Sequence, residues 1–205
     1  MLTLYHAPLS RSSVIAQAII EMEVADRVHV RPTQVPRADG SGAVDPANPH
    51  PEGKVPLLDH GGTHVWERPA ILIYLSDLFP DAPGIRPAGH AQRGPFLSWL
   101  AYYGDVVEPV FILKAAELSH PYITAGLRGF DEVAGRLSRT FADGRDFLLP
   151  DGFSVADLLV ASPFMWFRDY LPEDPATRAW FERVDSRASV EAVRQSDQAA
   201  MTAAA

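Results

Sequence analysis

The pattern of apolar residues changes near residue 80, and this change limits the folds that the chain can adopt. Before it, short segments of alternating apolar and polar residues, typical of strands, are interspersed with segments of helical spacing. After it, strand-like segments nearly vanish. The first region is predicted to contain strands at 2–5, 28–30, 55–59 and 63–66 and helices at 11–23 and 68–78. This order predicts a mixed sheet flanked by helices, followed by an all-helical region.

A helix stop and linker, Phe-Pro-Asp-Ala-Pro-Gly at 79–84, separates the two regions. We therefore predict an α/β domain at 1–80, a linker at 81–87 and an all-helical domain at 88–205. Beyond residue 189 the chain is expected to fray. Glu108-Pro109 is predicted to kink a helix, because proline removes a backbone hydrogen bond. One face of that helix carries Phe96, Trp99, Leu100, Tyr103, Val107, Val110 and Phe111.

Composition and charge exclude several classes of partner. The 205 residues include 26 acidic and 18 basic side chains, giving a net charge of −8, and there is no basic run. Nucleic acid and anionic membranes are therefore not expected as partners. No stretch of eighteen residues is both uncharged and apolar enough to span a bilayer, and no secretory signal is visible. A cytoplasmic location is therefore expected.

The chain contains no cysteine, so any sulfur chemistry must use the sulfur of a substrate. This excludes a cysteine nucleophile, a thiolate metal site and disulfide exchange by the protein itself. The seven histidines are scattered and form no metal-ligand spacing, so no metal site is predicted.

A long segment rich in proline, glycine and aspartate, residues 32–53, leads to Val55-Pro56. A cis peptide bond before Pro56 would turn the chain sharply and leave the backbone N–H and C=O groups of Val55 free. Those groups could then pair with an extended peptide ligand, as in strand addition. The simpler alternative is a trans proline that opens a strand.

Glu67 and Arg68 stand at the start of a predicted helix. A helix N-terminus favours anions, and Arg68 would add a fixed positive charge beside it. Glu67 would supply a carboxylate for an ammonium group. Together they could hold the zwitterionic part of an α-amino acid, whereas the alternative is that Glu67 only offsets the helix dipole.

Ser154 and Asp157 have the spacing of a capping box at the start of a strongly apolar helix. Phe153 and Leu158 would pack together across the same helix start as a hydrophobic staple. We interpret these residues as a folding device and not as a catalytic site.

Four segments in this order, LYHAPLSRSS, GKVPLL, WERPAILIYL and FSVADLL, resemble the glutathione transferase superfamily, in its serine-type, bacterial-like, cytosolic two-domain form. The resemblance covers nearly the whole chain. It implies a thioredoxin-like glutathione-binding domain, an all-helical domain that contributes the hydrophobic substrate site, and a homodimer. It also favours the cis form of Pro56. Arg68 departs from the pattern, because it stands where the family usually has a serine.

The resemblance implies that the hydroxyl of Ser10, after the first strand, activates the glutathione sulfur. Tyr5 and Ser12 are the alternatives, and a purely structural reading makes Ser10 the cap of the first helix. The implied glutathione-binding residues are Lys54, Val55, Pro56, Glu67 and Arg68, and the hydrophobic substrate residues are Leu9, Trp99, Tyr103 and Trp166.

The implied function is conjugation of the glutathione thiolate to a small apolar electrophile, as in detoxification, with glutathione as co-substrate and no metal. Thiol transfer through a mixed disulfide needs a cysteine and is therefore excluded. The alternatives are a glutathione-dependent isomerase or dehalogenase, and a non-catalytic protein of the same fold that binds glutathione or a hydrophobic ligand.

Overall fold

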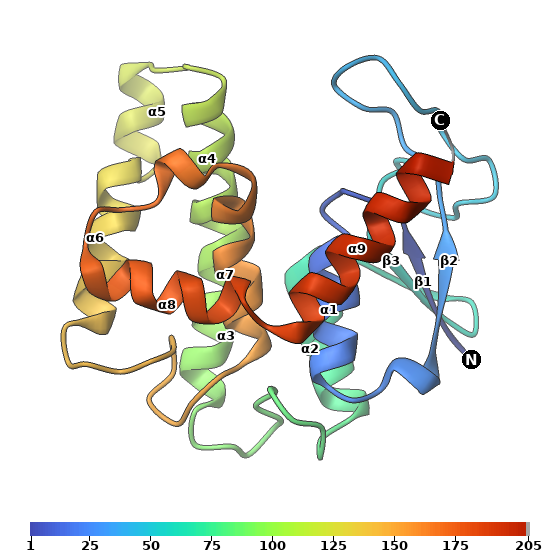
Figure 1. Ribbon diagram of the computed structural model, residues 1–205, viewed down its shortest axis with the longest axis horizontal. Helices are drawn as coiled ribbons and strands as arrows, with labels where there is room; N and C mark the ends of the chain where they lie inside the picture. The colour runs from blue at the N-terminus through green and yellow to red at the C-terminus, as the bar shows by residue number, and fades with distance from the viewer. Residues whose placement is uncertain (204–205) are drawn as a thin grey trace. The chain divides into compact units, whose positions relative to one another are not determined.

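The computed structural model describes residues 1–203, which form two compact units (Figure 1). One unit contains residues 1–87 together with the C-terminal segment from Arg187 onward, and the other contains residues 88–186. The α/β unit therefore includes the last helix, which the sequence analysis assigns to the helical domain.

The first unit contains a four-stranded mixed sheet, as predicted. Parallel strands β1 and β2 pair Leu2 with Val28, whereas β3 runs antiparallel to β1 and forms a hairpin with β4. The strands are β1 (Leu2–His6), β2 (Val28–Pro32), β3 (Leu57–His60) and β4 (Thr63–Trp66), in the spatial order β2-β1-β3-β4. With its helices, this sheet has the thioredoxin-like arrangement that the resemblance implies.

Three helices accompany the sheet: α1 (Ser13–Glu21), α2 (Arg68–Leu78) and α9 (Ala188–Ala203). A short 3-10 turn, Ala25–Arg27, leads from α1 into β2. Helix α1 packs against both α2 and α9. The apolar core of this unit includes Leu4, Leu57, Leu58, Ile15, Ile19, Ile71, Leu72 and Leu75, all of them buried.

Helix α9 lies in the first unit because one of its faces packs on α1. Its buried residues, Ser189, Val190, Val193 and Asp197, recur at helical spacing. Before its first turn, Arg187 donates two hydrogen bonds to the Glu21 carboxylate of α1, at 2.8 and 2.6 Å. The expectation of fraying beyond residue 189 is therefore wrong.

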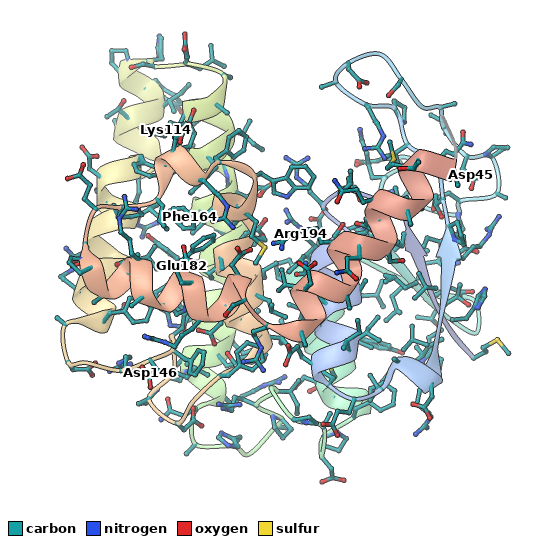
Figure 2. All side chains as sticks on the ribbon, viewed as in Figure 1. Asp45, Lys114, Asp146, Phe164, Glu182 and Arg194 are labelled. Carbon is teal, nitrogen blue, oxygen red and sulfur yellow. The ribbon has the colours of Figure 1, made fainter. Side chains whose placement is uncertain are left out.

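The second unit is all-helical, as predicted. Phe164 lies inside it, with its ring centroid 4.9 Å from that of Phe111 and 6.2 Å from that of Phe181 (Figure 2). Its elements are α3 (Arg93–Tyr102), η2 (Tyr103–Val107), α4 (Glu108–Ala115), α5 (Pro121–Gly126), α6 (Phe130–Phe141), α7 (Val155–Trp166), η3 (Arg168–Tyr170) and α8 (Pro175–Asp185).

The predicted capping box begins α7. Asp157 Oδ2 accepts hydrogen bonds from the Ser154 amide at 2.8 Å and from the Ser154 hydroxyl at 3.1 Å. The other carboxylate oxygen, Oδ1, accepts from the Leu148 amide at 2.8 Å and from Trp180 Nε1 at 2.9 Å. Burial raises the pKa of Asp157, although all of these hydrogen bonds act to lower it. The motif thus joins the start of α7 to α8 and to the segment that precedes α7.

Residues 93–115 form one 23-residue helical segment that contains the π-helical turn η2. This turn precedes Pro109, which has no N–H group to donate. The segment is long and apolar enough, by length and composition, to cross a membrane, and the sequence analysis did not identify it. A core helix of a soluble protein passes the same test. In this helix Phe96 and Leu100 are completely buried.

Candidate functional site

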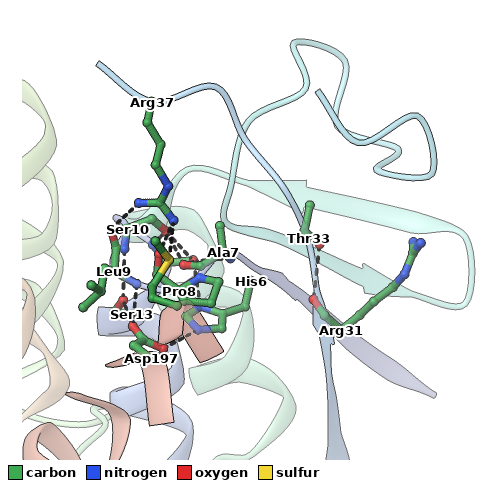
Figure 3. Close-up of polar contacts among 12 residues, drawn as sticks. His6, Ala7, Pro8, Leu9, Ser10, Ser13, Arg31, Thr33, Arg37 and Asp197 are labelled. Atoms are coloured by element: carbon green, nitrogen blue, oxygen red, sulfur yellow. Dashed lines mark hydrogen bonds and ion pairs between the residues drawn. The ribbon is translucent and has the colours of Figure 1, made fainter. Parts of the chain in front are cut away.

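The turn between β1 and α1 is held by hydrogen bonds between its serines and its own backbone (Figure 3). The hydroxyl of Ser10 donates to the Ala7 carbonyl at 2.7 Å and accepts from the Ser12 amide at 3.1 Å. Leu9 has a positive φ of 49°, a left-handed conformation that is uncommon for leucine. Helix α1 begins at Ser13 with Ser12 as its N-cap residue, so Ser10 does not cap the helix.

A buried network that the sequence analysis missed links this turn to α9. His6 Nδ1 lies 2.7 Å from Ser12 Oγ, and His6 Nε2 lies 2.8 Å from Asp197 Oδ1. The exposed fractions of His6, Ser12 and Asp197 are 8, 0 and 2%. One available signal is the period of β1, which places His6 on the same buried face as Leu2 and Leu4. The polar residue on that apolar face required a buried partner.

Asp197 also fixes the turn directly. Its Oδ2 atom accepts hydrogen bonds from the Leu9 amide at 2.8 Å and from the Ser13 hydroxyl at 2.6 Å. Burial acts to raise the pKa of Asp197, but the hydrogen bonds from His6, Ser13 and Leu9 outweigh it and hold the pKa below its ordinary value. Asp197 is therefore favoured as a carboxylate.

The side of the turn opposite α1 is fixed by Arg37, in the segment after β2. Its guanidinium donates to the Pro8 carbonyl at 2.7 Å and to the Leu9 carbonyl at 3.3 Å. It also lies 3.4 Å from the sulfur of Met201 in α9. Two charged side chains, Arg37 and Asp197, thus hold the backbone that carries Ser10.

Tyr5, the first alternative to Ser10, points to the other face of β1, because successive side chains of a strand alternate. The guanidinium of Arg31 lies 4.9 Å from the centre of the Tyr5 ring. Tyr5 therefore has a partner outside the network of His6 and the serines.

The Val55–Pro56 peptide bond is cis. Val55 lies just before the β3 ladder, which begins at Leu57, so its backbone groups do not belong to the sheet. Lys54 is exposed, and its carbonyl accepts a hydrogen bond from Asn48 Nδ2 at 2.9 Å.

Glu67, the N-cap residue of α2, is exposed and has φ 66°, a strained conformation for a residue other than glycine. Its carbonyl begins the helix by accepting the Ile71 amide at 2.9 Å. Arg68 is the first helical residue and is largely buried, with 9% of its surface exposed. The α2 N-terminus is thus a positive helix end with one carboxylate beside it.

Strand register brings three predicted parts of the site to one end of the sheet. β1 pairs Tyr5 with Leu57, and β3 pairs Leu57 with Trp66. The turn after β1, the cis bond before β3 and the start of α2 therefore emerge at that same end. This arrangement can hold an extended peptide between the Val55 backbone and the α2 N-terminus, with a serine hydroxyl nearby.

The predicted hydrophobic substrate residues of the helical unit do not gather in one environment. Trp99 is 6% exposed and is packed under Arg136, whose guanidinium lies 5.0 Å from its ring centre. Tyr103 is 1% exposed, and its hydroxyl donates to Glu108 Oε2 at 2.6 Å. Trp166, at the end of α7, is 58% exposed. A pocket within this unit is lined by other residues, which include Val110, Lys114, Ile123, Arg128 and Phe130.

Among residues 1–203, no group of three or more histidine, aspartate or glutamate side chains is placed to hold a metal ion.

No family model matches the sequence. The chain is 25% identical to a probable glutathione S-transferase of Oryza sativa subsp. japonica over 63% of this chain and 62% of that protein. It is 29% identical to a probable omega-2 glutathione transferase of Caenorhabditis briggsae, over 71% and 64%. A dichloromethane dehalogenase of Methylorubrum extorquens is 26% identical, over 71% and 58%. The chain spans less than two thirds of the length of each of these three curated relatives.

Solved structures of low sequence identity share the fold along nearly the whole chain. A glutathione transferase from Methylococcus capsulatus superposes with a TM-score of 0.75 at 24% identity, covering 97% of this chain and 99% of that one. A sphingomonad glutathione S-transferase in complex with glutathione gives 0.73 at 24% identity, covering 96% and 98%.

Proposed function

We propose that this chain, whose fold and curated relatives both point to the glutathione S-transferase superfamily, is a glutathione transferase. It would bind glutathione, stabilise the thiolate and join the sulfur to a small apolar electrophile. The proposal rests on one observation above all, the meeting of the turn after β1, the cis Val55–Pro56 bond and the start of α2. Because the chain has no cysteine, the reacting thiol belongs to glutathione.

In this proposal the backbone N–H and C=O groups of Val55 pair with the cysteinyl residue of glutathione, as an added strand would. The carboxylate of the γ-glutamyl group is held at the α2 N-terminus with Arg68, and its ammonium is held by Glu67. Lys54 adds to the binding surface, and Pro56, which is buried, contributes through its cis bond to Val55. The exposed carboxylate of Glu67 and the exposed Lys54 support this assignment.

We assign the activating hydroxyl to Ser10, which is half-buried, whereas Ser12 is completely buried and reaches a ligand only through Ser10. A hundredfold rise in the ionisation constant of a thiol requires about 2.7 kcal/mol. A hydrogen bond to the thiolate contributes ~1.5–3 kcal/mol and a nearby helix N-terminus ~0.3–1 kcal/mol. Together these two contributions can supply the free energy that ionisation of the thiol requires. Tyr5 remains the alternative hydrogen-bond donor.

The second substrate is proposed to be a small apolar electrophile. Leu9 is half-buried and Trp166 is exposed, so both have side-chain surface for contact. Trp99 and Tyr103 are almost fully buried, and we propose that they support the hydrophobic substrate site without contacting the electrophile. We further propose a cytoplasmic homodimer that acts in detoxification, with no metal, no nucleic acid and no membrane as a partner.

The test combines a calorimetric titration of glutathione with a conjugation assay that uses a generic aryl halide. The wild type should bind glutathione and turn over. Ser10→Ala should lose turnover while keeping most of its glutathione affinity, whereas Ser98→Ala, at an exposed serine of α3, should change neither. Turnover that survives Ser10→Ala but disappears in Tyr5→Phe would move the role to Tyr5. Failure of the wild type to bind millimolar glutathione would refute the proposal.

Two other functions remain candidates on specific observations. Arg68 in place of the usual serine favours a protein that binds glutathione or a hydrophobic ligand without turnover, and binding without conjugation would support it. The similarity to a dichloromethane dehalogenase favours a glutathione-dependent dehalogenase or isomerase. Halide release from dihalomethanes in the presence of glutathione would support that reaction.

A further inference from the structure

Four polar side chains form a continuous series of hydrogen bonds from the turn after β1 into the interior of the first unit. Ser10 Oγ lies 2.8 Å from Ser12 Oγ, and Ser12 Oγ lies 2.7 Å from His6 Nδ1. His6 Nε2 lies 2.8 Å from Asp197 Oδ1. Each link is a hydrogen bond of ordinary length between atoms that can carry or accept a proton.

Of these four side chains, Ser10 is the most exposed. Ser10 is half-buried, whereas Ser12 is fully buried and His6 and Asp197 are nearly so. A molecule bound at the turn can therefore touch Ser10 but not the other three. Ser12, His6 and Asp197 have the residue types of a catalytic triad of nucleophile, base and acid. Ser12 is fully buried, however, and cannot attack a substrate.

The hydrogen bonds define the direction in which protons can move. Because His6 Nε2 faces the Asp197 carboxylate, it donates, and in the neutral ring Nδ1 must then accept the Ser12 hydroxyl proton. The Ser12 oxygen accepts the Ala7 amide at 3.1 Å and lies within reach of the Ser10 hydroxyl. In this structure the Ser10 hydroxyl donates to the Ala7 carbonyl at 2.7 Å, and rotation about its C–O bond lets it donate instead to Ser12 and accept from a ligand.

We propose that Ser10, Ser12 and His6 form a proton relay, ending on the His6–Asp197 pair, that takes up the proton of the bound glutathione thiol. The thiol proton passes to Ser10 Oγ, the Ser10 proton to Ser12 Oγ and the Ser12 proton to His6 Nδ1. The products are a thiolate, two neutral hydroxyls and an imidazolium paired with the Asp197 carboxylate. No proton leaves the protein, and Ser10 then donates its hydrogen bond to the thiolate.

Two charged side chains face this network from different elements. The Asp197 carboxylate, from α9, lies 2.8 Å from His6 Nε2. The Arg37 guanidinium, from the segment after β2, binds the Pro8 and Leu9 carbonyls, so its charge is directed to the backbone of the turn. Asp197 remains ionised because of the hydrogen bonds that it accepts from His6, Ser13 and Leu9. Ser12, His6 and Asp197 therefore act on the sulfur through Ser10, as positioning residues.

A purely structural role would use the same hydrogen bonds to tie α9 to the turn, so stability alone cannot separate the two roles. The number of protons released when glutathione binds does separate them. Calorimetry of glutathione binding in two buffers of different ionisation enthalpy measures protons released per site, and the ultraviolet absorbance of the thiolate measures ionisation at the same pH. The relay predicts that the wild type forms thiolate without a matching release of protons.

The variants are Asp197→Asn and His6→Gln, with Glu21→Gln as the matched control. Glu21 is the acid at the other tie between α1 and α9, outside the relay. Either relay variant should release one proton for each thiolate formed or lose the thiolate band, and kcat/KM of His6→Gln should fall about 100-fold, at the lower end of general acid–base contributions. Glu21→Gln should keep the wild-type proton count.

This inference rests on the proposed function, and the two fail in different ways. No glutathione binding by the wild type overturns the function itself. Binding with a thiolate band but one proton released per site in the wild type overturns only the relay. An unchanged thiolate band and proton count in both His6→Gln and Asp197→Asn, with circular dichroism showing folded variants, also overturns it.

Discussion

His6 and Asp197 are 191 positions apart in the chain, and their side chains lie 2.8 Å apart inside the first unit. This hydrogen bond joins the first strand to the last helix. The same carboxylate accepts hydrogen bonds from Leu9 and Ser13, so one residue near the C-terminus organises the turn that carries Ser10. Helix α9 is therefore part of the candidate site.

The lowered pKa of Asp197 predicts a loss of stability in acid. The folded state favours the carboxylate, so its contribution is fully present above the unfolded pKa, near 3.9, and is lost as the pH falls through the lower folded pKa. The free energy of unfolding of the wild type should therefore fall more steeply below about pH 4 than that of Asp197→Asn. Urea unfolding at a series of values between about pH 3 and pH 7 measures this. Parallel pH profiles of the two proteins would contradict the prediction.

Replacement of Asp157 should destabilise the helical unit strongly. Asp157→Ala removes the acceptor of four donors, the Leu148 and Ser154 amides, the Ser154 hydroxyl and Trp180 Nε1. Because each buried donor left unpaired costs about 1–3 kcal/mol, the free energy of unfolding should fall by at least ~3 kcal/mol. The control is Asp174→Ala, which removes the N-cap of α8 and should cost about 1 kcal/mol. Urea unfolding followed by tryptophan fluorescence compares them, and equal losses would contradict the prediction.

The features that sequence predicted well depend on residues close together in the chain. The strands on either side of residues 61–62, which pair as a hairpin, and the capping box of Ser154 and Asp157 are of this kind. Their signals are local, because turn chemistry and helix caps act over a few residues. The cis bond before Pro56 was inferred with the help of the family resemblance, since the local pattern also allows a trans proline.

The missed features depend on contacts between distant segments. The buried face of α9 consists of Ser189, Val190, Val193 and Asp197. The spacing of these residues does not reveal that the face packs on α1, and the alanine-rich end of the helix suggested fraying. His6 was visible as a polar residue in a strand, but its partner Asp197 is on the last helix. The two-domain division at residue 80 therefore assigned α9 by its position in the chain, whereas its buried face places it in the first unit.

The tie between Glu21 and Arg187 should contribute measurably to the docking of α9. Hydrogen bonds to a charged group contribute about 1.5–3 kcal/mol, and burial, which acts to raise the pKa of Glu21, is outweighed by the bonds from Arg187 and Ser189. Glu21→Ala should therefore lower stability by about 1–2 kcal/mol and speed hydrogen exchange in α9.

The matched control for this tie is Glu191→Ala, which removes an exposed ion pair with Arg194 within α9 itself. Exposed pairs of this kind contribute about 0.2–1 kcal/mol, so this variant should leave exchange in α9 close to that of the wild type. Equal exchange rates in the Glu21 and Glu191 variants would show that the tie does not hold the helix.

Arg68 should bind glutathione by charge, where the family usually uses a serine hydroxyl. Arg68→Ala should weaken glutathione binding about 10- to 100-fold, because a charged hydrogen bond contributes about 1.5–3 kcal/mol. If the contact is ionic, as proposed, the wild-type Kd should rise with salt more steeply than that of Arg68→Ser, which keeps a donor without the charge. The control is Arg178→Ala, at an exposed position of α8. Calorimetric titrations at low and high salt provide the measurement, and equal salt dependence of the wild type and Arg68→Ser would place Arg68 outside the binding site.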